Sequence, residues 1–96
     1  MKFSIIIPAY NEEKEIGATI NSLLKLKTSR KDFEIVVADN NSTDKTSVVA
    51  KKAGADKVVL ETTKGTNFAR EAGRKVAKGK IVAFLDADSI VPVDWL

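Results

Sequence analysis

Residues 81–88 read Ile81-Val82-Ala83-Phe84-Leu85-Asp86-Ala87-Asp88, an unbroken apolar run followed by two aspartates one residue apart. Such a run, bounded by turn residues, is typical of a strand covered on both faces of a parallel sheet. In open α/β sheets, ligands bind outside the carboxyl ends of the strands. Because residues two apart on an extended chain point the same way, we expect Asp86 and Asp88 to share one hard cation, which in turn holds a diphosphate.

Three other strand-like runs precede this one, and helical patterns separate all four. The runs are Phe3–Ile7, Ile35–Ala38 and Val58–Leu60. The order β-α-β-α-β-α-β predicts an α/β fold, because parallel strands need helical crossovers. We therefore expect a Rossmann-like three-layer α/β/α arrangement with a mainly parallel sheet of about four strands, in a single domain over residues 1–96.

Capping residues suggest where the three helices begin and end. Asn11 is expected to cap the first helix, and Ser42 to cap a second that ends near Ala53, with Gly54 just beyond it. The third helix is expected from about Thr66 to Lys78.

The composition excludes several kinds of chemistry. The chain contains no His and no Cys, so imidazole bases, thiolate nucleophiles and disulfides are absent, and any metal must bind oxygen ligands, as Mg²⁺, Mn²⁺ or Ca²⁺ does. The net charge is only +3, and aromatic residues make up 6% of the chain without interleaving a basic stripe, so we expect no nucleic-acid partner.

The sequence contains no apolar stretch long enough to span a membrane. Pro8 and Asn11 interrupt the first apolar run, so it does not resemble a signal peptide. A cytoplasmic location is the default expectation. The mild positive charge leaves attraction to a membrane surface open as well.

Four segments, in order, resemble the N-terminal half of family-2 glycosyltransferases with the GT-A fold. Ser4–Glu13 is similar to that family's opening strand and loop, and Val36–Asp44 to its second strand and acidic turn. Gly65–Gly79 resembles its G-x-x-x-A-R-x-x-G helix, and Phe84–Asp88 its D-x-D motif. The resemblance covers essentially all 96 residues and implies the strand order 3-2-1-4.

The resemblance also implies roles for individual residues. It places Pro8, Tyr10 and Glu12 near the nucleotide base and lets Asp39 accept hydrogen bonds from that base. Asn40 stands where many members have Asp. Gly65 permits close approach of the backbone to the ligand, and Arg70 would reach a phosphate. Of Asp86 and Asp88, one acid would face the ribose and the other would bind Mn²⁺ or Mg²⁺ on the diphosphate.

Each of these residues also has a purely structural interpretation. Tyr10 suits packing, Glu12 a helix N-terminus and Arg70 a solvated surface. Asp39–Asp44 suits a turn with a helix cap. The Asp86–Asp88 segment suits an ordinary acidic loop.

By resemblance, the function is to bind a nucleoside-diphospho-sugar donor with a divalent metal. In a full-length catalytic domain, the sugar would then pass with inversion to a lipid-linked or saccharide acceptor. Family members are longer than this chain and carry their catalytic base on a later segment, so no catalytic residue is expected among these 96 residues. The alternatives are a non-catalytic nucleotide- and metal-binding or oligomerising relic domain and, more remotely, a phosphoacceptor receiver domain. We also expect a homodimer, because the fourth strand would form an apolar sheet edge near Trp95 and Leu96.

Overall fold

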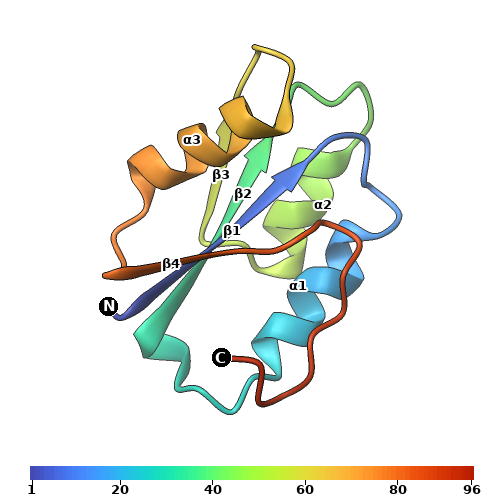
Figure 1. Ribbon diagram of the computed structural model, residues 1–96. Coiled ribbons are helices and arrows are strands. Elements are labelled where there is room, and N and C mark those ends of the chain that lie inside the picture. The colour runs from blue at the N-terminus through green and yellow to red at the C-terminus, as the bar shows by residue number, and fades with distance from the viewer.

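A computed structural model describes all residues from Met1 to Leu96. Strands and helices alternate along the chain, with a short 3-10 turn at Arg30–Asp32 (Figure 1). The elements are β1 (Phe3–Ala9), α1 (Ile16–Leu24), β2 (Phe33–Asp39), α2 (Thr46–Ala53), β3 (Lys57–Leu60), α3 (Thr66–Val76) and β4 (Ile81–Phe84). The four strands form one parallel sheet in the order β3-β2-β1-β4, which confirms the expected order.

The sheet lies between two helical layers, as Figure 1 shows: α1 and α2 lie on one side and α3 on the other. The main hydrophobic core fills the space between the sheet and α1 and α2, with Ile5, Ile7, Ile20 and Val37 fully buried. On the other side α3 lies close to the sheet, because a Cβ added at Gly73 would come within 2.5 Å of Ile6 Cγ2. The three-layer α/β/α architecture is therefore confirmed.

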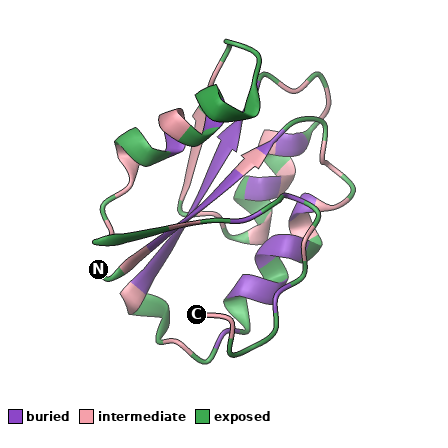
Figure 2. Ribbon diagram, in the orientation of Figure 1, coloured by how far each residue is buried: buried purple, intermediate pink, exposed green.

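Burial differs sharply between the central and the outer strands (Figure 2). Every residue of β2 is buried, as are Ser4–Ile7 of β1. The prediction that Ile81–Leu85 is covered on both faces was wrong, since Ile81, Val82 and Phe84 are exposed and only Leu85 of this run is buried. β4 pairs with β1 alone, so it is an edge strand, and no element of the chain covers its outer side.

Two of the predicted helix starts were wrong. α1 begins at Ile16 instead of directly after Asn11, and α2 begins at Thr46 instead of after Ser42. Both proposed caps bond to a distant loop instead, as described below. Gly54 does end α2 with a left-handed φ of 118°, and α3 ends at Val76, two residues before the predicted Lys78.

A buried polar cluster fixes the amino-terminal end of the sheet. The Glu34 carboxylate accepts hydrogen bonds from Ser4 Oγ at 2.6 Å and from the Lys78 backbone N–H at 2.7 Å, and Lys57 Nζ lies 2.9 Å away. Ser4 Oγ in turn accepts a bond from the Gly79 N–H. These bonds tie the α3–β4 connection to β1 and β2, which sets where β4 begins. None of the helices has the length and apolar character needed to cross a membrane.

Candidate functional site

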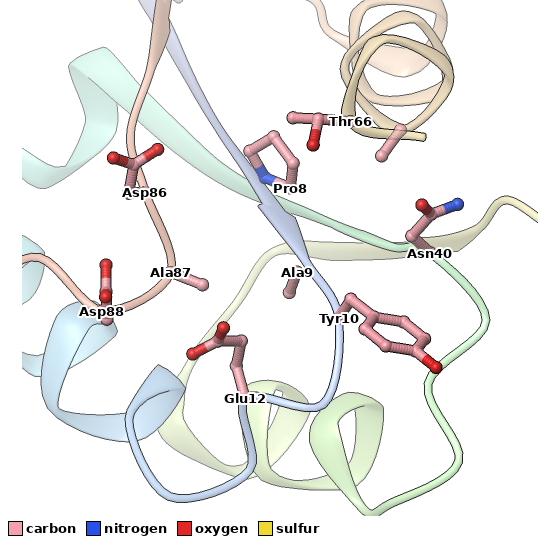
Figure 3. Close-up of a pocket in the computed structure, with 10 residues that line it drawn as sticks. Pro8, Ala9, Tyr10, Glu12, Asn40, Thr66, Asp86, Ala87 and Asp88 are labelled. Carbon is pink, nitrogen blue, oxygen red and sulfur yellow. The ribbon is translucent and has the colours of Figure 1, made fainter. Parts of the chain in front are cut away.

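The carboxyl ends of the strands surround a hollow of about 330 Å³. Because the strands are parallel, the loops that follow β1, β2 and β4 all emerge at this edge of the sheet, together with the start of α3 (Figure 3). The lining residues are Pro8, Ala9, Tyr10, Glu12, Asn40, Thr66, Ala69, Asp86, Ala87 and Asp88. Six of the nine site residues predicted from the sequence line this one cavity, and the other three, Asp39, Gly65 and Arg70, do not.

The two aspartates lie on a turn and not on extended chain. The Ser89 N–H donates to the Asp86 carbonyl oxygen at 3.1 Å, so residues 86–89 form a turn directly after β4. The prediction that Asp86 and Asp88 lie on extended chain was therefore wrong, because the strand ends at Phe84. Both side chains are nevertheless exposed at the hollow, since the turn bends around its rim.

Helix α1 holds this turn from below through two hydroxyls. Thr19 Oγ1 donates to the Ala87 carbonyl oxygen at 2.8 Å, and Ser22 Oγ accepts from the Val91 N–H at 3.2 Å. Thr19 is fully buried and Ser22 nearly so. Neither residue was among those predicted from the sequence. Their signal was a pair of hydroxyls beside the apolar stripe of Ile16 and Ile20, where a buried polar group needs a partner.

Glu12 brings a third carboxylate to the same cavity. In Figure 3 its carboxylate points toward Asp88. Burial raises the pKa of Glu12, and the negative charges of Glu15, Asp88 and Asp44 raise it further. This side of the hollow is therefore strongly negative and favours a cation.

The carboxylates that line the hollow fit a hard divalent cation that also binds the phosphates of a ligand. Every charged group lining the hollow is a carboxylate, and the oxygen ligands that Mg²⁺ and Mn²⁺ prefer are supplied by Asp86 and Asp88. No group of three acidic residues lies close enough to hold a metal ion alone. Mg²⁺ in particular is commonly held by one or two carboxylates together with substrate phosphates, and that is the arrangement these residues allow.

Asp39 does not line the hollow and is only 5% exposed. Its carboxylate accepts hydrogen bonds from the Ser42 N–H at 3.0 Å, from Ser42 Oγ at 2.6 Å and from Ser47 Oγ. These bonds occupy three of the roughly four acceptor positions of a carboxylate and fix the start of the β2–α2 loop.

The loops after β1 and β2 bond directly to each other. Asn11 donates its backbone N–H to Ser42 Oγ and accepts from the Thr43 N–H, both at 2.9 Å. The Glu12 N–H donates to Thr46 Oγ1 at 2.9 Å, and Thr46 is oriented by Asp44. The pKa of Asp44 is lowered because hydrogen bonds from Thr46 and Glu13 outweigh the effect of desolvation. Asn11 and Ser42, expected as helix caps, thus hold together the loops that carry Tyr10 and Glu12.

Asn40 and Gly65 shape the opposite wall. The side-chain amide of Asn40 bonds to the backbone of residues 61, 63 and 65. Gly65 precedes α3 with a φ of 135°, a value that L side chains rarely adopt. Its carbonyl oxygen accepts from the N–H groups of Phe68 and Ala69 and so starts the helix.

Tyr10 and Arg70 are both exposed but lie in different places. The Tyr10 ring is 46% exposed and, in Figure 3, lies across the hollow from the Asp86–Asp88 turn. The Arg70 guanidinium lies 5.6 Å from the centre of the Phe84 ring. It lines an adjoining hollow that shares Pro8 and Asp86 with the first, so it is near Asp86 without reaching into the main cavity.

Comparison with known proteins gives a consistent result. The family model described as Glycosyl transferase family 2 matches residues 4–96. The poly(ribitol-phosphate) beta-N-acetylglucosaminyltransferase TarS of Staphylococcus aureus is 37% identical over 102 residues, which cover 100% of this chain and 18% of TarS. The chain thus spans about a fifth of that protein.

Solved structures share the fold. The crystal structure of S. aureus TarS 1–349 in complex with UDP superimposes with a TM-score of 0.90 at 36% identity, over 98% of this chain and 29% of that one. The mannosyltransferase PcManGT from Pyrobaculum calidifontis, in complex with GDP-Man and Mn²⁺, gives a TM-score of 0.89 at 30% identity, over 95% and 28% of the two chains. These likenesses confirm the GT-A nucleotide-binding fold expected from the motifs, and the chain belongs to glycosyl transferase family 2.

Proposed function

We propose that this chain binds a nucleoside-diphospho-sugar donor together with a divalent cation, as the donor-binding part of a longer inverting glycosyltransferase. The observation that carries the proposal is the hollow at the strand ends, where the Asp86–Asp88 turn lies across from Tyr10. An aromatic ring suits a nucleotide base, and carboxylates suit a cation on a diphosphate.

The two sides of the hollow suggest how the donor lies. We place the base by Tyr10 and Pro8, with Glu12 beside it and Asp39 and Asn40 behind it. Asp39 keeps about one acceptor position free for the base. The ribose and diphosphate then extend past Gly65 and Asp86 toward Asp88, with Arg70 near enough to the shared rim to meet a phosphate.

Asp88, assisted by Asp86, would hold Mn²⁺ or Mg²⁺. A divalent cation there offsets the negative charge of the departing nucleoside diphosphate. The mannosyltransferase PcManGT, with GDP-Man and Mn²⁺, supports a divalent metal in this family. The carboxylates of this chain contribute the negative field and the oxygen ligands.

Sugar transfer itself is proposed for the whole protein. Deprotonating an acceptor needs a positioned general base, and we assign that role to none of the carboxylates that line the hollow. A lipid-linked or saccharide acceptor remains part of the proposal, as does a cytoplasmic location with contact to a membrane surface. The nucleotide-bound relatives favour a donor-binding glycosyltransferase over a non-catalytic relic domain.

Calorimetric titration of the chain tests donor binding. Uridine and guanosine diphosphates are titrated with Mn²⁺ and, separately, with a chelator. We expect saturable binding of at least one nucleotide, at one site per chain, that tightens when Mn²⁺ is present. Heats that show no binding of either nucleotide up to millimolar concentration would contradict the proposal.

We also propose that the chain forms a homodimer through β4. The support is the open edge of β4, where Ile81 is 50%, Val82 36% and Phe84 43% exposed. Light scattering at micromolar concentration should give the mass of a dimer, and Val82→Lys should return it to a monomer. A monomeric mass at all concentrations for the unsubstituted chain would refute this.

A further inference from the structure

The side chain of Asn40 is engaged at every polar atom. Its Nδ2 group donates to the Glu61 carbonyl oxygen at 3.0 Å and to the Thr63 carbonyl oxygen at 2.8 Å. Its Oδ1 atom accepts from the Gly65 N–H at 2.9 Å. The two carbonyl partners can only accept and the N–H can only donate, so the partners fix which end of the amide faces which group.

These contacts hold the loop between β3 and α3. Asn40 is 8% exposed, whereas residues 62–65 are exposed. The Glu61 N–H donates to the Asp39 carbonyl oxygen at 2.8 Å, and beyond that bond only Asn40 joins residues 61–65 to the strands. The one other side-chain bond in the loop, from the Thr63 N–H to Glu61 Oε2, is local.

The loop leads directly into the wall of the hollow. Gly65 precedes α3, and Thr66 and Ala69 of its first turns line the cavity. In Figure 3, Thr66 lies across the hollow from the Asp86–Asp88 turn. The backbone N–H of Asn40 donates to the Ala9 carbonyl oxygen at 2.8 Å, so Asn40 is itself fixed to β1. Packing of Gly73 against Ile6 holds the middle of α3 on the sheet, and Asn40 holds the loop that leads into its first turn.

We propose that Asn40 is a positioning residue whose amide holds the Glu61–Gly65 loop and thereby places the first turn of α3 against the bound nucleotide. This inference rests on the proposed nucleotide binding and gives Asn40 a role that requires an amide. A carboxylate at this position has the same shape, but it lacks donors and would set negative oxygen against two carbonyl oxygens.

The test compares Asn40→Asp with Asn41→Asp. Asn40→Asp keeps the shape and the acceptor for Gly65 but removes both donors. Asn41→Asp adds the same charge one residue away, on an exposed side chain with no hydrogen bond, so it controls for repulsion of an anionic ligand. Asn40→Ala removes the side-chain amide without adding charge, and it replaces Asn40→Asp as the test variant if Asn40→Asp does not fold. Ile20→Val, in the core between α1 and the sheet, controls for general loss of stability.

Two measurements are made on each variant: hydrogen exchange of the amides of residues 62–69 in the free protein, and the Kd for uridine diphosphate with Mn²⁺. For Asn40→Asp and Asn40→Ala we expect about tenfold faster exchange in the loop and about tenfold weaker binding, equivalent to about 1.4 kcal/mol. Asn41→Asp and Ile20→Val should leave loop exchange and Kd close to those of the unsubstituted chain.

Two results would overturn the proposal. Weaker binding with unchanged loop exchange would mean that Asn40 contacts the nucleotide directly. Faster loop exchange with unchanged Kd would mean that the loop does not position the α3 wall. If the unsubstituted chain binds no uridine diphosphate, the proposed function fails for that nucleotide, while the loop exchange of Asn40→Asp still tests whether Asn40 holds the loop.

Discussion

Thr19 Oγ1 donates a 2.8 Å hydrogen bond to the carbonyl oxygen of Ala87, the residue between the two aspartates. The bond is buried and joins positions 68 residues apart in the chain. It fixes the backbone of the Asp86–Asp88 turn from the helix beneath it. The position of both carboxylates is therefore set partly by α1, an element that supplies no side chain of its own to the hollow.

Thr19→Val should weaken the site as well as the fold. Valine has nearly the same shape but no donor, so the buried Ala87 carbonyl loses its partner, at a cost of about 1–3 kcal/mol in the free energy of unfolding. Urea denaturation measures that cost, and calorimetry should show weaker uridine diphosphate binding in Mn²⁺. Thr19→Ser keeps the hydroxyl and should preserve binding. Equal binding by the valine and serine variants would contradict this role for the hydrogen bond.

Two glycine substitutions should change stability in opposite directions. A Cβ at Gly17 in α1 meets only Val49 Cγ1 at 3.7 Å, so Gly17→Ala should stabilise the fold by about 0.5–1 kcal/mol through helix propensity. At Gly73 in α3 the Cβ would lie 2.5 Å from Ile6 Cγ2, so Gly73→Ala should destabilise it by about 1–3 kcal/mol. Urea denaturation of both variants checks the signs. A Gly73→Ala variant as stable as Gly17→Ala would mean that α3 does not lie this close to the sheet.

The buried cluster around Glu34 should make stability depend on pH. Burial raises the pKa of Glu34, but hydrogen bonds from the Lys78 N–H, Ser4 and Lys57, together with the Lys57 charge, outweigh it, and the net pKa is lowered. The carboxylate therefore stabilises the fold above its unfolded pKa of about 4.3, and this contribution is lost as the pH falls through the lower folded value.

Glu34→Gln isolates that contribution. The glutamine amide removes the charge that faces Lys57 Nζ, which keeps its hydrogen bond to the Val76 carbonyl oxygen. At pH 7 we therefore expect a loss of about 1–3 kcal/mol in the free energy of unfolding. The difference between the two proteins should shrink as urea denaturation is repeated at lower pH, below the unfolded pKa. A difference that stays constant from neutral to acid pH would show that the Glu34 charge does not stabilise the fold.

The apolar runs were enough to predict the sheet. All four runs became strands, and the order expected from the family resemblance is the order observed. The misjudged burial of β4 has a physical reason. An apolar run shows that a segment can be buried, but burial of its faces also needs a helix packed on them. The helices pack mainly on β1, β2 and β3, so Ile81 and Val82 stay exposed.

The sequence predicted most of the residues that line the hollow, but not the contacts that hold them in place. Tyr10, Glu12, Asp86 and Asp88 do line one hollow, because strand ends of a parallel sheet meet at one edge. The contacts that hold them lie between residues distant in sequence. Asn11 was predicted to cap a helix because the local sequence pattern fits a cap. Its actual partner, Thr43, lies 32 residues away, and local patterns carry no information about such distant pairs.

In the proposed function, Asp88 couples nucleotide binding to a divalent cation. The direct measurement is the ratio of the uridine diphosphate Kd in a chelator to that in Mn²⁺, for the unsubstituted chain, Asp88→Asn and Asp94→Asn. Asp94 is an exposed acid outside the hollow and serves as the charge-matched control. We predict tighter binding in Mn²⁺ for the unsubstituted chain and Asp94→Asn, and a ratio near one for Asp88→Asn. An equal gain from Mn²⁺ in all three proteins, or no gain in any, would contradict the account.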